Sequence, residues 1–174
     1  MRTIFLAPLF FLFALAAVNQ QGCEGYKLNP ISGSSYGDST QVSVSMFTNN
    51  APLAKATLAQ TVTEGLRDGL QRQTKMELVP RNGDIVFEGS ITGYAITPVS
   101  IQGGNDIAAL NRLTITVSVK FTDTKTEKNS FDAVFTRFAD YKSSQNLQSV
   151  EDDLIKEITE QLVQDILNRA INNW

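Results

Sequence analysis

Hydrophobic and polar residues alternate along several segments of the chain, which predicts strands of a half-buried sheet. The clearest alternation lies at 113–121, where five apolar residues alternate with four polar ones: Leu113, Ile115, Val117, Val119 and Phe121 with Thr114, Thr116, Ser118 and Lys120. Weaker patterns predict strands at 41–47, 84–97 and 129–138, and a short one at 76–79. Phe138 is out of phase, which predicts a bulge or the end of its strand.

The alternation also predicts which side chains are buried. Within 41–47, Val42, Val44 and Met46 fall on one face. Within 84–97, the odd positions from Ile85 to Ala95 form the apolar face. The even positions of that strand are expected on the opposite face.

Two other segments carry apolar residues at helical spacing. Four leucines and valines recur every four residues and predict a helix that ends near Thr74: Leu58, Val62, Leu66 and Leu70. Gly65 and Gly69 lie on one side of it, which favours close backbone packing over the docking of a partner. A long helix is predicted from Ser149, its expected N-cap, onwards. These elements predict an α+β fold, a two-layer sandwich of a mostly antiparallel sheet with two helices packed on one face.

The first residues have the pattern of a secretory signal peptide. A basic start is followed by an apolar run at 4–18, which is shorter than a membrane-spanning helix. Residues 1–22 are therefore predicted to be removed. Cys23, the only cysteine, stands where a lipoprotein signal places the acylated thiol. Gln20 and Gln21 are unusual in such a signal, so ordinary cleavage near 14–16 is the alternative.

The rest of the chain is predicted to be one domain behind a tether. Residues 23–40 are rich in Gly, Ser, Asn and Pro and show no apolar periodicity, which indicates a flexible, lipid-anchored tether. Residues 41–174 then form a single domain.

Composition excludes several classes of function. The 174 residues include 15 Lys and Arg, 18 Asp and Glu, and no His. No His and a single Cys remove the commonest general base and the usual metal ligands. No phosphate-binding loop or activated nucleophile is apparent, so we expect no enzyme, no cofactor and no metal. The acidic balance argues against nucleic acid as a partner.

The polar face of the predicted sheet is rich in hydroxyl groups. It is expected to present mostly Ser and Thr: Glu88, Ser90, Thr92, Tyr94, Thr114, Thr116, Ser118, Lys120, Asp132, Val134 and Thr136. Thr suits strands for backbone reasons, so this can be an ordinary solvated face. Alternatively, a partner or a glycolipid covers it. The sequence leaves both readings open.

Four segments together resemble one protein family. They are TNNAPL (48–53), GDIVFEGSITGY (83–94), NDIAALNRLTITVSVKF (105–121) and the stretch from FTRFADYK to the end (135–174). They are similar to the LptE family of lipopolysaccharide-assembly lipoproteins, in its Bacteroidota form. The resemblance implies a non-catalytic, acylated outer-membrane lipoprotein on the periplasmic side. It would plug the lumen of a large β-barrel partner, LptD, which delivers lipopolysaccharide to the outer leaflet.

The resemblance also suggests candidate site residues. Contact with lipopolysaccharide phosphates needs cations, and the candidates are Arg112, Lys120 and Arg137. A predicted protruding loop at 97–111 would touch the barrel, and Trp174 would cap the core or anchor an interface. The barrel-interface candidates are Thr92, Tyr94, Ile101, Ile107, Thr114, Thr116, Ser118 and Trp174. A free-standing lipoprotein that binds a small ligand or another envelope protein is the alternative function.

Overall fold

The computed structural model describes residues 40–103 and 106–171. The predicted signal peptide, Cys23, nearly all of the predicted tether and Trp174 lie outside this range. The elements, in chain order, are β1 (Gln41–Val44), β2 (Thr48–Asn49), α1 (Leu58–Gln73), β3 (Glu77–Leu78), β4 (Ile85–Gly103), β5 (Asp106–Asp123), the 3-10 turn η1 (Glu127–Asn129), β6 (Phe131–Lys142) and α2 (Leu147–Ile171).

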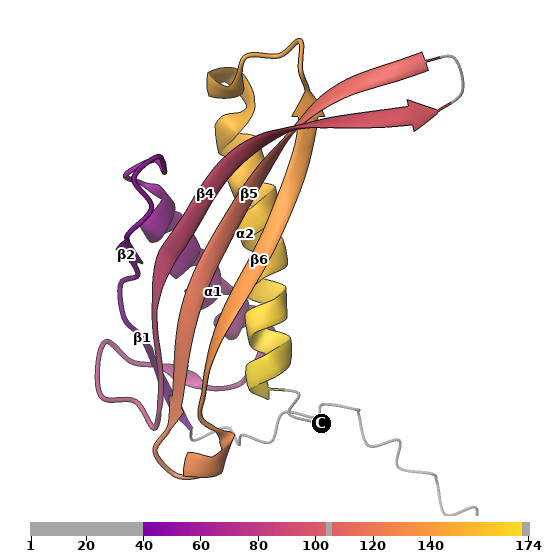
Figure 1. Cartoon of the computed structure of the whole chain (residues 1–174). Helices are drawn as coiled ribbons and strands as arrows, with labels where there is room; N and C mark the ends of the chain where they lie inside the picture. Colours follow the sequence, from indigo (N-terminus) through magenta and orange to yellow (C-terminus); the bar gives the residue numbers. More distant parts are fainter. Residues whose placement is uncertain (1–39, 104–105, 172–174) are drawn as a thin grey trace, which may run out of the picture. The chain divides into compact units, whose positions relative to one another are not determined.

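The predicted α+β sandwich is confirmed. The sheet has the strand order β3-β1-β4-β5-β6, with β2 also paired to β4, and both helices lie against one face of it (Figure 1). The long pairs β4–β5 and β5–β6 are antiparallel, whereas β1 is parallel to both β3 and β4. The parallel β1–β3 pair follows from its connection, because α1 carries the chain back to the starting edge before β3 begins.

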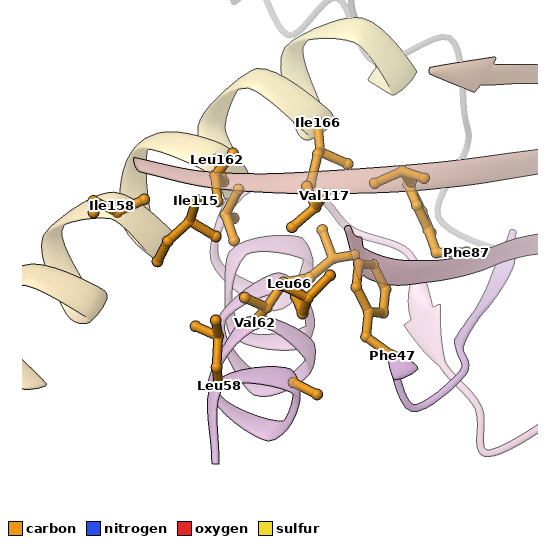
Figure 2. Packing of buried hydrophobic residues seen from close by; sticks show 14 of the residues in the cluster. Phe47, Leu58, Val62, Leu66, Phe87, Ile115, Val117, Ile158, Leu162 and Ile166 are labelled. Carbon is orange, nitrogen blue, oxygen red and sulfur yellow. The ribbon is translucent and has the colours of Figure 1, made fainter. Parts of the chain in front are cut away.

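The core lies between the sheet and the two helices (Figure 2). All five apolar residues predicted to face inward from β5 are at most 2 % exposed. The predicted stripe on α1 is also buried, with Leu58, Val62 and Leu66 fully enclosed. The helices touch where α1 carries Gly69, since a Cβ there would lie 2.7 Å from Val163 Cγ1 of α2. Close packing therefore accounts for this glycine.

The alternation predicted for 41–47 stops after Val44. Met46 is 57 % exposed, whereas Phe47 is 2 % exposed, so the expected burial of Met46 is wrong. The chain leaves the strand between β1 and β2, and the backbone N–H of Phe47 donates to Thr63 Oγ1 on α1 at 3.0 Å. The Phe47 ring then occupies the space above Gly89, where a Cβ would lie 2.5 Å from the ring. A glycine in β4 therefore allows this step.

A β-bulge changes which residues of β4 face the helices. The β4–β5 register shifts between Ile91 and Gly93, leaving Thr92 without a directly opposite residue. Before the bulge the odd-numbered residues of β4 face the helices, and beyond it the even-numbered residues do so. Tyr94 is therefore buried and Ala95 is exposed, the opposite of the sequence expectation.

The segment 97–111 is not the predicted loop. β4 continues to Gly103 and β5 starts at Asp106, and the two strands pair in register over this whole length. Figure 1 shows this distal hairpin extending away from the helices. A protruding element was expected here, and the hairpin does protrude. It consists of strands, because pairing between β4 and β5 compensates for the weak alternation of apolar and polar residues in this segment.

Phe138 neither ends β6 nor marks a bulge. The β5–β6 register runs without a shift from the Phe121–Phe131 pair to the Leu110–Lys142 pair. Phe138 simply belongs to the even-numbered residues of β6, which face away from the helices.

Helix α2 starts earlier than predicted. It begins at Leu147, and Asn146 Oδ1 accepts a hydrogen bond from the backbone N–H of Gln148 at 3.0 Å. Asn146, and not Ser149, therefore provides the side-chain cap. The described part of the chain contains no helix long and apolar enough to cross a membrane.

Candidate functional site: the outer sheet face

The face of the sheet opposite the helices is uncovered by any described element, and we call it the outer face. Residues directly opposite one another on paired strands share a face, so the registers define its rows. Five rows cross β4, β5 and β6 in order along the strands: Glu88–Lys120–Asp132, Ser90–Ser118–Val134, Gly93–Thr116–Thr136, Ala95–Thr114–Phe138 and Thr97–Arg112–Asp140.

The three middle rows carry no charge. Two hydroxyl groups meet at their centre, where Thr116 Oγ1 and Thr136 Oγ1 lie 3.0 Å apart and share a hydrogen bond. Thr92, exposed at the bulge, donates to the backbone oxygen of Thr116 at 3.4 Å. Two large apolar side chains complete this band, with Val134 65 % and Phe138 45 % exposed. We call these rows the uncharged band.

A tightly paired arginine closes one end of the band. Arg112 donates two hydrogen bonds to the Asp140 carboxylate, at 2.7 and 2.8 Å, and its guanidinium carbon lies 3.6 Å from the centre of the Phe138 ring. The hydrogen bonds from Arg112 lower the pKa of Asp140 below its ordinary value. The charge pair is therefore satisfied within the sheet, and the aromatic ring holds it in place.

The three cations proposed for lipopolysaccharide phosphates do not converge. Arg112 is bound to Asp140, and Arg137 donates to both carboxylate oxygens of Asp165 on α2, one at 2.7 Å. Lys120 lies eight positions from Arg112 along β5, roughly 26 Å at 3.3 Å per residue. Among the described residues, only Lys120 of these three has no acidic partner within 4.0 Å. A single phosphate site built from all three is thus excluded by their placement.

The barrel-interface candidates also separate. Thr92, Thr114, Thr116 and Ser118 lie in or beside the uncharged band. Ile101 and Ile107 lie in the distal hairpin, opposite Ala108 and Gln102. Tyr94 does not belong to this group, because the bulge directs it to the helix side.

Tyr94 instead joins a partly buried polar cluster at the start of α2. Its hydroxyl donates to Glu151 Oε1 at 2.5 Å, and Lys55 Nζ lies 3.6 Å from Glu151 Oε2 and 2.6 Å from Asp152 Oδ1. Burial raises the pKa of Tyr94, and the neighbouring Glu151 raises it further. Tyr94 and Glu151 are buried, whereas Lys55 and Asp152 reach the surface, so the cluster links β4 and the segment before α1 to the start of α2.

Sequence reasoning missed the role of Phe138 and the Arg112–Asp140 pair. Side chains at even positions of a strand share one face, so counting from Asp132 to Asp140 would have placed Phe138 on the outer face. The ion pair joins two strands through their register, for which a single sequence has no local signal.

No clustered metal ligands occur in the parts of the chain that the structure covers, 40–103 and 106–171. The outer face offers hydrogen-bonding groups and apolar side chains.

Two solved bacterial proteins have a similar fold. A minor lipoprotein from Acinetobacter baumannii is 16 % identical, with a TM-score of 0.50, covering 77 % of this chain and 94 % of its own. A protein from Xanthomonas campestris is 11 % identical, with a TM-score of 0.54, covering 83 % and 89 %. At such low sequence identity, these two structures show that the fold is similar and nothing more. The comparison with curated proteins finds no match.

The model of the LptE family, described as lipopolysaccharide-assembly, matches residues 39–170. That range contains every described helix and strand except the last residue of α2. The family's role is a non-enzymatic one in lipopolysaccharide assembly. This chain belongs to the LptE lipopolysaccharide-assembly family.

Proposed function

We propose that this chain is an outer-membrane lipoprotein that plugs and supports an LptD-like β-barrel, in the translocon that delivers lipopolysaccharide to the outer leaflet. The observation that carries the proposal is the family match over residues 39–170. The domain would lie on the periplasmic side, largely within the barrel lumen. The Bacteroidota form of the family, to which the quoted segments are similar, belongs to the same proposal.

The outer face supports contact with a barrel wall. The interiors of large outer-membrane barrels are polar. The uncharged band can exchange hydrogen bonds with such a wall through Thr114, Thr116 and Ser118 without burying an unpaired charge. Its apolar members, Val134 and Phe138, would be removed from water in the same contact. The distal hairpin, with Ile101 and Ile107, offers a second contact, and Trp174 stays a candidate anchor.

The anchor is the acylated Cys23. Residues 1–22 would be removed as the signal peptide, and residues 23–40 would link the acylated cysteine, including its palmitate, to the domain. Several acyl chains on one residue hold a protein stably to a membrane, whereas one chain does not.

Lys120 is the cation best suited to a lipopolysaccharide phosphate. It lies on the outer face in the row beside Glu88 and Asp132, and no ion pair occupies its ammonium group in the described structure. Arg112 and Arg137 would first have to give up two hydrogen bonds each.

The test is a pull-down of the tagged full-length protein from gently solubilised native membranes, with mass spectrometry of the bound proteins. We expect a large β-barrel in stoichiometric amount. Thr136→Asp places a charge in the middle of the uncharged band and should reduce recovery of the barrel about tenfold or more. Thr57→Asp is the matched control, since it makes the same change at an exposed position before α1.

Two results would count against the proposal. Recovery of the lipoprotein without any barrel would favour the free-standing binding module. Equal recovery of the barrel by both variants, with unchanged circular dichroism, would remove the outer face from the interface.

A further inference from the structure

The outer edge of β6 is open. Strand β6 pairs with β5 along one edge over its whole length and is the last strand in the sheet order. Among the described residues no strand pairs with its other edge, which Figure 1 shows at the border of the sheet. An unpaired edge presents a row of backbone N–H and C=O groups that can pair with another strand. β6 contains no proline and no bulge that would prevent this.

A groove follows this edge on the helix side, between β6 and α2. It contains two adjoining hollows of about 370 and 500 Å³, both of which Glu157 lines. Asp153 lies in the first hollow and Glu160 in the second. The groove is therefore bounded by a strand edge on one side and by acidic side chains of α2 on the other.

Three of these carboxylates have no cationic partner. Asp140 and Asp165, which also line the hollows, are held by Arg112 and Arg137. By contrast, Asp153, Glu157 and Glu160 are exposed, and in the described structure no cation lies within 4.0 Å of them. Their spacing of four and three residues places them on one side of α2. Lys142 also lines the first hollow, but it does not offset all three of these acids, so the groove carries net negative charge beside an unpaired strand edge.

We propose that the edge of β6 accepts an extended, basic segment of a partner protein as an added strand. Every second side chain of such a segment would point toward α2, and the spacing of these side chains, about 6.7 Å, is close to the rise of about 6 Å between Asp153 and Glu157. Lys or Arg at these positions would meet the free carboxylates. The remaining side chains would extend the rows of the outer face and would be neutral. This surface differs from the uncharged band, and the inference does not rest on a barrel partner.

The experiment uses the full-length protein in a neutral detergent and a labelled synthetic peptide that alternates Lys with Thr or Val. Fluorescence anisotropy measures its binding, and hydrogen exchange measures protection of the β6 amides. We expect binding that weakens with salt, together with slower exchange along β6. The same peptide with Glu in place of Lys should bind at least about tenfold more weakly.

Matched variants separate charge from strand addition. Asp153→Lys with Glu157→Lys should weaken binding about tenfold or more, whereas Glu64→Lys with Asp68→Lys, the same change of charge on α1, should not. A Lys peptide methylated on alternate backbone nitrogens keeps its charge but loses its donors, and it should not bind.

Several outcomes would overturn the proposal. They are failure of the Lys peptide to bind, equal binding of the methylated peptide, or no effect of the α2 variants. Sedimentation that reveals a dimer of the protein, dispersed by Asp153→Lys with Glu157→Lys, would assign the edge to a second copy of the chain instead.

Discussion

At the scale of single residues, the contact between Tyr94 and Glu151 joins β4 to α2 within the buried part of the molecule. Glu151 lies in the first turns of α2, where an exposed acid would be ordinary, yet it is 8 % exposed. Its carboxylate is stabilised by the Tyr94 hydroxyl and by nearby Lys55. The hydroxyl reaches Glu151 only because the bulge at Thr92 turns the side chain of Tyr94 to the helix side of β4.

Tyr94→Phe should lower the free energy of unfolding by about 1.5–3 kcal/mol, because a buried carboxylate loses a donor. Tyr141→Phe is the matched control. Tyr141 is similarly buried, at 7 %, and its hydroxyl makes no hydrogen bond among the described residues, so this change should cost less than about 0.5 kcal/mol. Urea denaturation of both variants measures the difference. Equal stability of the two would mean that the Tyr94–Glu151 hydrogen bond contributes nothing.

At the scale of elements, the close packing of α1 against α2 depends on Gly69. A Cβ there would lie 2.7 Å from Val163 Cγ1 and 2.9 Å from Leu167 Cδ1. Alanine is the better helix former by about 1 kcal/mol, so helix propensity and packing act in opposite directions at this position. Packing should dominate, since the β-branched Val163 cannot easily turn away.

We therefore expect Gly69→Ala to destabilise the domain by about 1–2 kcal/mol net, although alanine favours helices. Val163→Ala removes the nearer methyl group. The double variant should be more stable than the sum of the two single changes predicts, by about 0.5 kcal/mol or more. Additive losses in urea denaturation would show that the two residues do not compete for space.

At the scale of the whole molecule, the anchor and the folded domain should be separable. The described elements run from β1 to α2, and Cys23 lies outside the described residues. Cys23→Ala should therefore release the protein from membranes in cells that lack the barrel, because the acyl chains are lost. Membrane fractionation measures the release, and circular dichroism of the released protein should be unchanged. Persistent association with membranes in those cells would contradict lipidation at Cys23.

Much of the architecture could be predicted from local pattern. The alternation at 113–121 identifies a strand and its buried face, because side chains of a strand point to opposite sides in turn. The spacing of Leu58, Val62, Leu66 and Leu70 likewise identifies a helix and its buried stripe. The segments similar to the LptE family add the role in lipopolysaccharide assembly, which the family match confirms.

The candidate site could be predicted only in part. The hydroxyl-rich outer face follows from alternation in β5, and Thr114, Thr116 and Ser118 are placed there correctly. The facing of Tyr94 depends on a bulge, and a bulge arises from pairing with another strand. Local periodicity therefore put Tyr94 on the wrong face.

Local pattern was enough to predict the types of the main elements and the buried faces of β5 and α1. These properties depend on residues close together in the chain. The folded chain alone reveals the strand order, the extension of β4 and β5 into the distal hairpin, and the pairing of Arg112 with Asp140 and of Arg137 with Asp165. It also shows that, within 40–103 and 106–171, no strand pairs with the outer edge of β6 beside the carboxylates of α2. Each of these depends on segments far apart in the sequence, whose contacts form when the hydrophobic faces pack together.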